Sequence, residues 1–349
     1  MAVLETVISG NTSVIVTVAT PVSSIGLLGY DYTNIQTNAR FASEYFNGKL
    51  QIHDPNLELN VEGSVDLRNN RNRIQIKGLL DSAYLHNLNL VPTYAILHSE
   101  MDIDIQGLVL DSLRGTARLS NIEAHYDDES IELKNITLSA ERSKLERQIT
   151  LNTSLFDAWV NGDFYFSNLF QDLPALIKEF RLNIENDPAA IQNYNSKRGK
   201  VPNRYAADFK FNLKNMKSVL DFLDIDVGIS QNTLLEGRYS NGPTSNFQAF
   251  TKVDSLRYAT NNFFKTELEI NASKFFDSTN ALAMVYVYSR DQSLGNIRTN
   301  NLTGEVIWDR SHIDVDLSIA QPETTNLFNL SGVVEFNDST IIKLLPSTM

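Results

Sequence analysis

Apolar and polar residues alternate with a period of two along much of the chain. The alternation is clearest in residues 57–67, 101–106, 313–319 and 328–336. The apolar positions of the first of these ranges are Leu57, Leu59, Val61, Val65 and Leu67. Because successive side chains of a β-strand point to opposite faces of its sheet, each range predicts a strand with one apolar and one polar face.

Short polar segments separate these runs. They comprise residues 69–72, 127–130 and 337–339, and they are rich in the Asn, Asp and Ser residues that favour turns. Short strands joined by polar turns, with few helical signals between them, are typical of an antiparallel meander. The sequence therefore predicts an all-β fold: an elongated, curved antiparallel sheet of stacked amphipathic strands, a β-taco or open trough, with one or two short helices.

Two segments carry a helical period instead. Asp172 is expected to cap the first helix, with Pro174 near its first turn and apolar residues at helical spacing as far as Ile184. A shorter helical signal spans residues 213–223. The segment between them, residues 186–206, is polar and contains glycine and proline, which predicts a loop.

These signals divide the chain into three parts. Residues 1–185 are expected to form a first β-taco segment that ends in a helix. Residues 186–206 are expected to be a polar junction loop, and residues 207–349 a second β-taco segment, truncated at its C-terminal end. A unit of alternating strands and a polar turn recurs loosely along the chain, without a fixed period.

Charge and cysteine content exclude several classes of function. The 349 residues carry a formal net charge of −12 and include no cysteine. An acidic chain repels nucleic-acid phosphates, and its short basic cluster, Lys197–Lys200 with Arg204, is typical of a solvated loop. We therefore expect no nucleic-acid partner. Disulfides, zinc fingers and thiol nucleophiles are excluded because each needs cysteine.

The two ends of the chain are expected to be cuts through a longer protein. Residues 1–10 have no basic segment and carry Glu5, so they do not form a signal peptide. The most apolar stretch, residues 14–28, is interrupted by Thr, Ser and Pro, whereas a membrane-spanning helix needs about 20 apolar residues. Any membrane anchor is therefore expected outside this chain.

No motif for catalysis or for a bound cofactor stands out. His53 beside Asp54 could form a metal or general-base pair, but a histidine at a strand end beside a turn aspartate is usually structural. Asp102 and Asp104 resemble the start of a calcium loop, yet its twelfth position is Leu113 and not glutamate. Phosphate-binding and nucleophile-elbow motifs are absent. We expect no enzyme, no metal and no cofactor.

The apolar face of so large a sheet must be covered. A second sheet would cover it in a sandwich, the plainer architecture. Alternatively, the sheet curls into a trough whose aliphatic lining is left for an apolar ligand, and acyl chains suit such a lining. The residues expected to line this lipid groove are Leu57, Leu59, Val61, Val65, Leu67, Ile103, Ile105, Ile131, Leu133, Ile313, Val315 and Leu317.

Several segments share one strand pattern. Residues 48–67 carry a D-x-N element, an alternating strand and a G-x-x-D element, and His86–Leu90 ends in L-N-L. Related pieces are residues 113–121, 161–170 and 328–347. In this order, and over most of the chain, these segments resemble the TamB or AsmA-like family, the translocation and assembly module of the bridge-like lipid transfer type.

The resemblance implies an interior segment of a long β-taco that spans the periplasm of a Gram-negative cell. It implies an inner-membrane anchor through an N-terminal helix absent from this chain. It also implies that a missing C-terminal domain engages an Omp85-type barrel in the outer membrane. The family is linked to phospholipid transport and to outer-membrane biogenesis and protein secretion.

The interpretations of function differ in what the sheet binds. In the favoured one, the apolar groove conducts phospholipid acyl chains between the inner and outer membranes. The alternative is a scaffold or chaperone whose strand edges pair with outer-membrane β-barrel proteins during assembly and secretion. A sandwich adhesin is the structural alternative, and an enzyme is disfavoured because no site signature is found.

Overall fold

The structure of the chain is a computed structural model. It describes residues 4–9, 13–68, 72–92, 94–126, 129–143, 146–197, 204–222, 225–276, 281–336 and 340–345. The contacts within it divide the chain into two compact units. The first unit comprises residues 1–142 and 149–154, and the second comprises residues 143–148 and 155–349.

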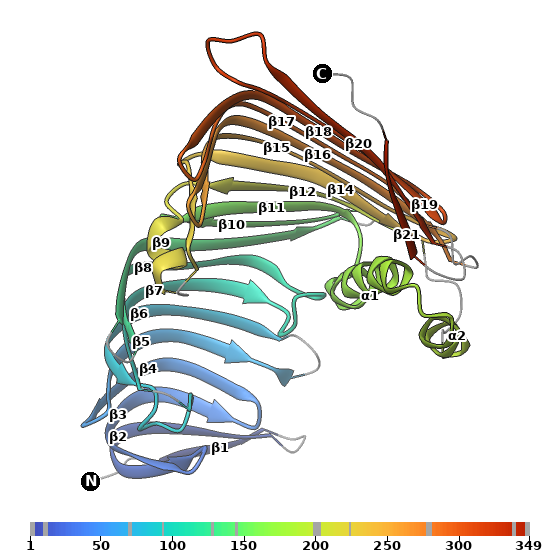
Figure 1. Cartoon of the computed structure of the whole chain (residues 1–349). Coiled ribbons are helices and arrows are strands. Elements are labelled where there is room, and N and C mark those ends of the chain that lie inside the picture. Colours follow the sequence, from blue (N-terminus) through green and yellow to red (C-terminus); the bar gives the residue numbers. More distant parts are fainter. Residues whose placement is uncertain are drawn as a thin grey trace. The chain divides into compact units, whose positions relative to one another are not determined.

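The first unit is a curved, open sheet, coloured blue to green in Figure 1. Each of its first eight strands is antiparallel to the next along the chain, and the ninth pairs with the tenth. The strands are β1 (Leu4–Ser9), β2 (Ser13–Leu27), β3 (Tyr30–Ala42), β4 (Tyr45–Asp54), β5 (Leu57–Asp66), β6 (Arg73–Tyr84), β7 (Ala95–Gln106), β8 (Arg114–Tyr126), β9 (Glu129–Arg142) and β10 (Arg147–Thr153).

The two faces of this sheet differ in chemistry, as the alternation predicts. Directly opposed residues of antiparallel strands share a face. One such row runs through Leu50, Val61, Gly78, Met101 and Leu119 and is apolar. The next row, on the other face, consists of charged residues that pair across strands: Lys49 with Glu62 at 3.1 Å and Lys77 with Asp102 at 3.2 Å. We call these the apolar face and the polar face.

Bulges bend the strands of the first unit. Asn34 in β3 and Asn121 in β8 have left-handed backbone angles, with φ of 50° at both. The register between β7 and β8 shifts by one residue beside Asn121, since His98 opposes Glu123 whereas Glu100 opposes Ser120. The apolar positions of β8 therefore step by three, from Leu119 to the buried Ile122. An extra residue of this kind increases the local bend and twist of a strand. These bulges contribute to the curvature of the sheet without turning apolar side chains to the polar face.

A small closed core fills part of the first unit. Tyr32, Ile35, Ile52, Ala83 and Leu88 are buried together, and Leu88 comes from the turn after β6 rather than from a strand. Partly buried side chains pack against this cluster: Tyr30, Leu50, Leu57, Leu59, Leu80 and Leu85. At this place the apolar face is therefore covered by the chain itself.

The carboxylate of Asp54 connects residues at the edge of this core through hydrogen bonds. It is 6% exposed and accepts hydrogen bonds from the backbone N–H and hydroxyl of Thr33, both at 2.8 Å, and from the N–H of Asn56 at 2.9 Å. The hydroxyl of Tyr30 donates a further bond. Burial opposes the ionisation of Asp54, but these bonds outweigh it and hold the pKa of the carboxyl below its usual value.

Replacing Asp54 by alanine is expected to destabilise the first unit by about 3 kcal/mol, because several hydrogen bonds to one charged group are lost. The folded pKa is lowered, so the wild-type contribution is present above the unfolded pKa of about 3.9 and is lost as the pH falls through the folded pKa. Hydrogen exchange of β3 and β4 at pH 7 and pH 3 measures both effects. The exposed Asp31→Ala is the control, and equal protection in the two variants would contradict the assignment.

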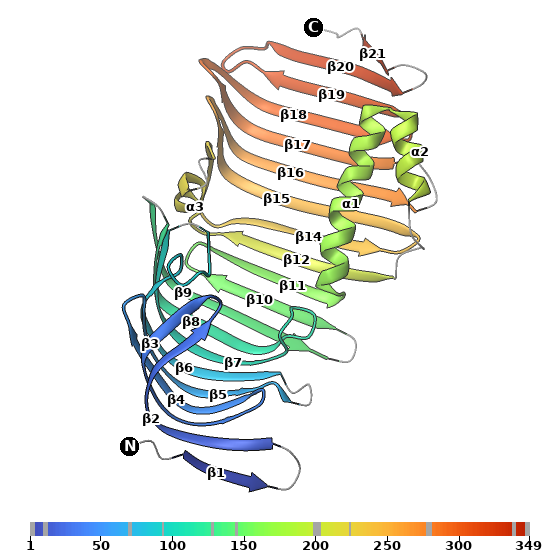
Figure 2. The same cartoon turned by 90° about the horizontal axis from the view of Figure 1, so that it is seen from below.

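The second unit is also a curved, open sheet, and each pairing between its strands is antiparallel. Figure 2 shows it from green to red. Its strands are β11 (Phe156–Asp163), β12 (Tyr205–Leu213), β13 (Val227–Ile229), β14 (Thr233–Asn241), β15 (Thr244–Tyr258), β16 (Asn261–Phe275), β17 (Ala281–Leu294), β18 (Ile297–Asp309), β19 (His312–Ala320), β20 (Leu327–Phe336) and β21 (Thr340–Leu345). Its helices are α1 (Phe166–Glu185), α2 (Pro188–Ser196) and α3 (Lys217–Phe222).

Helix α1 crosses the strands of the second unit and packs on their apolar face (Figure 2). Leu176 of the helix is buried against Tyr205 of β12 and Tyr239 of β14. Further along the helix, the ring of Phe180 meets Trp308 of β18 edge to face, with centroids 5.3 Å apart. The helix therefore covers the row of the sheet that lies toward one end of the strands.

The all-β, curved and open trough that the sequence predicts is confirmed. The predicted strands at 57–67 and 328–336 coincide with β5 and β20, and those at 101–106 and 313–319 lie within the longer β7 and β19. Of the predicted turns, residues 69–71, 127–128 and 337–339 lie outside the described residues, and Glu129 and Ser130 begin β9. Along the sequence, the chain passes from the first unit to the second between residues 142 and 155. The predicted parts 1–185, 186–206 and 207–349 stay a prediction.

The helical segments differ from the prediction in detail. Helix α1 begins at Phe166, six residues before Asp172, because Phe166 packs on Phe164 and on the sheet core. Asp172 is therefore not its cap, and Pro174 lies inside the helix. Within the expected loop, α2 forms because the side chain of Asp187 accepts hydrogen bonds from the first free N–H groups, those of Ala189 and Ala190. Of the described residues in the second helical signal, 213–223, only those of α3 are helical; Leu213 is the last residue of β12, and residues 214–216 connect the two elements.

Candidate functional site

The predicted lining residues of the first unit share one face of its sheet. Val65 of β5 is opposed to Ile74 of β6, which is opposed to Ile105 of β7. Ile103 lies in the neighbouring row of the same face, opposed to Ile76. All of these side chains are half-buried, and no described helix packs on them. The register thus brings β5 and β7 residues together as the prediction requires.

Other predicted residues of the first unit have different surroundings. Leu57 and Leu59 pack against the closed core around Leu88, so they are covered by the chain itself. Val61 is buried, and Leu67 follows the end of β5. Leu133 of β9 is half-buried opposite Ile122, whereas the side chain of Ile131 lies outside the described part of the structure.

The predicted residues Ile313, Val315 and Leu317 lie on β19 in the second unit, half-buried on the apolar face. Val315 belongs to a row that crosses the sheet from β11 to β20 and contains no charged residue. The row consists of Val160, Phe209, Gly237, Ala249, Ile270, Val285, Val306, Val315 and Gly332. Of its side chains only Ala249 is fully buried.

Helix α1 adds an exposed apolar stripe beside this row. Phe170, Ile177 and Ile184 recur every seven residues, which places them on one side of the helix. They are 60%, 68% and 54% exposed, unusually high for large apolar side chains. The opposite side of α1 carries Asp172 and Glu179 and faces residues at the strand ends. The stripe therefore points toward the middle of the strands, where the apolar row lies.

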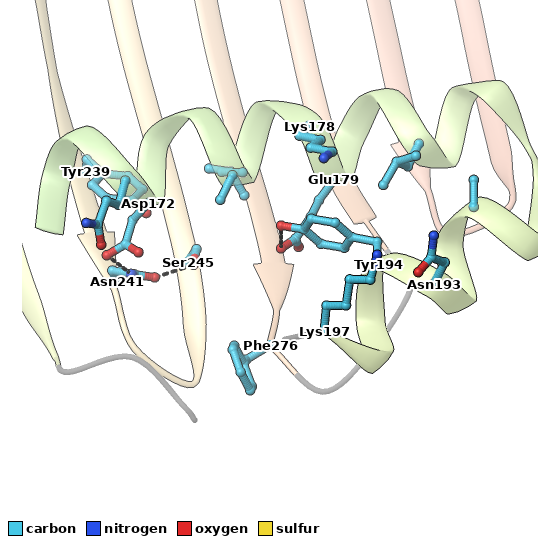
Figure 3. Close-up of a pocket in the computed structure, with 15 residues that line it drawn as sticks. Asp172, Lys178, Glu179, Asn193, Tyr194, Lys197, Tyr239, Asn241, Ser245 and Phe276 are labelled. Atoms are coloured by element: carbon cyan, nitrogen blue, oxygen red, sulfur yellow. Dashed lines mark hydrogen bonds between the residues drawn. The ribbon is translucent and has the colours of Figure 1, made fainter. Parts of the chain in front are cut away.

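A pocket of about 740 Å³ lies on the other side of α1, between this helix, α2 and the ends of β14, β15 and β16 (Figure 3). Asp172, Tyr239, Asn241 and Ser245 gather at one end, and Lys178, Tyr194 and Lys197 lie toward the other (Figure 3). The full lining is Gln171, Asp172, Ala175, Leu176, Lys178, Glu179, Leu182, Ala190, Asn193, Tyr194, Lys197, Tyr239, Asn241, Ser245 and Phe276.

Two carboxylates of α1 reach the pocket with different partners. Glu179 lies 3.6 Å from the ammonium group of Lys274, with 8% and 4% of the two side chains exposed, and Tyr194 donates a hydrogen bond to it at 3.2 Å. Asp172 accepts hydrogen bonds from the hydroxyl of Tyr205 at 2.8 Å and from the amide of Asn241 at 2.6 Å. Glu179 thus has a cationic partner, whereas both donors to Asp172 are neutral.

The tyrosines around Asp172 are held in their neutral form. Burial, followed by the field of Asp172, raises the pKa of Tyr239 to about 12. Burial, followed by the hydrogen bond to Asp172, raises the pKa of Tyr205 still further. Both phenols therefore remain protonated over the physiological pH range and can donate as well as accept hydrogen bonds.

The candidate metal and base residues of the sequence pair with other side chains. His53 lies 2.6 Å from Glu58, and Asp54 belongs to the hydrogen-bond cluster described above. Asp102 pairs with Lys77 at 3.2 Å, and Asp104 with Arg73 at 3.2 Å, both across strands of the polar face. The structure therefore brings none of these candidates together with another of them.

Open β-troughs are defined by shape, so a family assignment needs independent support from known proteins. No family model, curated protein or solved structure matches this chain. The resemblance to the TamB family stays a prediction. Among the described helices, none is both long and apolar enough to span a membrane.

Two features of this region were missed by sequence reasoning. The seven-residue spacing of Phe170, Ile177 and Ile184 was available as a signal, but spacing alone does not distinguish a covered face from an exposed one. The pocket joins side chains that are up to 105 positions apart, from Gln171 to Phe276, and no local pattern announces it. Both features depend on how α1 lies on the sheet.

Proposed function

We propose that the apolar faces of the two units bind the acyl chains of phospholipids. The observation that supports this most directly is the apolar row of the second unit beside the exposed stripe of α1. An isolated exposed leucine is ordinary, but a sheet row and a helix stripe that both leave apolar side chains accessible are typical of a binding surface. The neighbouring rows of the first unit, around Ile103 and Ile105, offer a second surface of this kind.

Acyl chains suit these surfaces better than polar ligands do. The sheet rows carry aliphatic and aromatic side chains, and in the first unit the charged residues of β6 and β7 lie on the opposite face. In the second unit the charged Lys274 lies near the end of its strand, where it pairs with Glu179. Each CH₂ group removed from water contributes about 0.8 kcal/mol, so even partial cover of a long chain holds it firmly. A uniform row with no converging polar groups does not fix one position along it, which favours movement of the chain through the trough.

The wider setting of this proposal comes from the resemblance to TamB proteins. In it, the chain is an interior segment of a periplasmic protein that moves phospholipid between the inner and outer membranes. An Omp85-type barrel in the outer membrane is then the partner of a different part of the protein. Acyl-chain binding itself can be tested on this chain alone, whatever the setting.

The test is recovery of lipid with the purified chain. The chain is purified in mild detergent from cells, and phospholipid per chain is measured by mass spectrometry. We expect bound phospholipid, and we expect less of it for the Ile103→Asp and Ile105→Asp double variant, because two carboxylates then lie among apolar side chains of the first unit. Some lipid should remain, since the second unit keeps its own apolar face.

The matched control is Gln106→Asp. Gln106 is the neighbour of Ile105 on β7, points to the opposite face, is exposed and lies between Arg73 and Arg114 in register. A carboxylate there should leave lipid recovery unchanged. Circular dichroism must show the same β content in all variants. A wild-type chain without phospholipid, or equal recovery from the double variant, would refute the proposal.

Strand pairing with β-barrel proteins is the second candidate function, and the edge strand β21 favours it. Among the described residues β21 pairs on one side only, with β20. Its apolar side chains Ile341, Ile342, Leu344 and Leu345 are all exposed. Exposed strand edges of this kind readily accept another strand.

A photoreactive residue at Lys343 tests this candidate against a purified, unfolded outer-membrane β-barrel protein. Cross-links to its strands, lost when a proline replaces Ile342, would support strand pairing. Cross-links that survive the proline, or none at all, would remove this candidate, because proline takes away a backbone donor of the edge.

A further inference from the structure

The pocket beside α1 contains a carboxylate, Asp172, that forms no ion pair with the part of the chain that the structure describes. Asp172 accepts its two hydrogen bonds through one oxygen, Oδ2, from Tyr205 and Asn241. No lysine, arginine or histidine among the described residues lies within ion-pair distance of it. A half-buried carboxylate is costly to desolvate and is normally matched by a positive charge. None of the described residues donates a hydrogen bond to the second oxygen, Oδ1, so it can accept one from a ligand.

The hydroxyl of Tyr239 is a second and independent sign of a missing partner. Tyr239 is 1% exposed, it lines the pocket next to Asp172, and its buried hydroxyl has no partner with good hydrogen-bond geometry within the described residues. The side chains of Tyr205 and Ser245 lie close enough to affect its pKa, but neither completes a hydrogen bond to it. A buried polar atom without a partner is rare in folded proteins and costs stability. A ligand with an N–H group could give one hydrogen bond to Asp172 and another to this hydroxyl.

The far end of the pocket carries the opposite charge. Lys178 and Lys197 both line it, and neither pairs with a carboxylate of the described residues. Lys178 lies over the ring of Tyr194, with its ammonium 5.2 Å from the ring centre. Asp172 and Lys178 are six residues apart on α1, which separates their backbones by about 9 Å along the helix axis. The flexible lysine side chains can shorten this distance to an anionic group of a ligand.

We infer that this pocket binds a small zwitterion, with its ammonium group at Asp172 and Tyr239 and its anionic group at Lys178 and Lys197. Phosphoethanolamine has this chemistry, either as a free compound or as the head group of a phospholipid. The inference goes beyond acyl-chain binding and does not depend on it, because the pocket and the apolar stripe lie on opposite sides of α1. Either can be lost while the other remains.

Calorimetric titration of the whole chain with three soluble probes tests the inference. The probes are phosphoethanolamine, ethanolamine and inorganic phosphate. We expect saturable binding of phosphoethanolamine, weaker binding of ethanolamine and the weakest binding of phosphate. Asp172→Asn should weaken phosphoethanolamine at least tenfold, because asparagine keeps the shape and an acceptor for Tyr205 but removes the charge. The double variant Lys178→Ala and Lys197→Ala should lower phosphoethanolamine to the level of ethanolamine.

Tyr239→Phe separates a ligand site from a structural network. It removes a hydroxyl that has no partner in the described residues, so the unfolding temperature without ligand should stay the same or rise. The affinity for phosphoethanolamine should nevertheless fall several-fold. A lower unfolding temperature with unchanged affinity would overturn the inference. So would the absence of phosphoethanolamine binding, or binding that Asp172→Asn leaves unchanged.

Competition identifies the source of the zwitterion. Phosphatidylethanolamine vesicles that displace phosphoethanolamine, where phosphatidylglycerol vesicles do not, would assign the pocket to a lipid head group. Binding of phosphoethanolamine that neither vesicle displaces would assign it to a free compound. Each result supports the zwitterion site. Equal displacement by both vesicles would show that the ammonium group is not recognised and would overturn it.

Discussion

Replacing Phe170, Ile177 and Ile184 by glutamine is expected to weaken acyl-chain binding by the second unit at least tenfold while leaving its fold intact. These side chains are largely exposed, so they contribute little to folding, and glutamine is a good helix former. Their apolar surface is nevertheless the part of α1 nearest the middle of the sheet. A loss of about 1.4 kcal/mol corresponds to tenfold in affinity, and three truncated apolar contacts exceed it.

The measurement is a titration with a fluorescent fatty acid. Every variant also carries Ile103→Asp and Ile105→Asp, which should abolish acyl-chain binding by the first unit. The control variant changes to alanine the residue that directly follows each stripe residue in the sequence. These three residues are Gln171, Lys178 and Glu185. This polar side of α1 should not affect the acyl chain. Equal affinities of the two triple variants would show that the stripe takes no part in binding.

Removing Glu179 is expected to destabilise the second unit by about 3–5 kcal/mol, because it takes away the carboxylate that faces the buried ammonium group of Lys274. Glu179→Leu and Lys274→Met should each show this loss. The double variant should recover most of it, since two apolar side chains of similar size then replace the pair. Urea unfolding followed by tryptophan fluorescence reports the effect, because both tryptophans, Trp159 and Trp308, lie in the second unit. Trp308 packs on Phe180 of the same helix.

An exposed ion pair of the same sheet is the control for this cycle. Lys252 and Glu267 lie 2.7 Å apart on neighbouring strands, and both are accessible to water. Removing either partner should cost less than about 1 kcal/mol. If Glu179→Leu has as small an effect as Glu267→Leu, the buried pair does not hold α1 on the sheet.

The strands and their faces follow from local rules, which is why the sequence predicts them. Alternation over 57–67 and 313–319 assigns each residue a side of the sheet, and the registers of β5 and β19 agree with it. The ion pair between Lys77 and Asp102 lies on the face that the pattern predicts to be polar. A period of two needs no knowledge of distant residues, since it is a property of the extended backbone itself.

The features that the sequence does not predict depend on tertiary packing. Bulges such as that at Asn121 shift the phase of the alternation, and the asparagine alone does not announce a shift. The start of α1 was misplaced because Asp172 has the composition of a cap but serves Tyr205 and Asn241 instead. Leu57 and Leu59, which the alternation predicts to line a groove, pack against the buried cluster to which Leu88 belongs. Each case is decided by a partner far along the chain.

The most direct test of the central claim is to locate a bound acyl chain on the sheet. The chain is incubated with a phospholipid that carries a photoreactive group at the end of one acyl chain, irradiated and digested, and the labelled residues are mapped by mass spectrometry. The account predicts labels on the apolar faces, near Ile103 and Ile105 in the first unit and near Val285 and Ile177 in the second. Labels concentrated on the polar face, for example at Asp102, or the absence of any label above background, would contradict it.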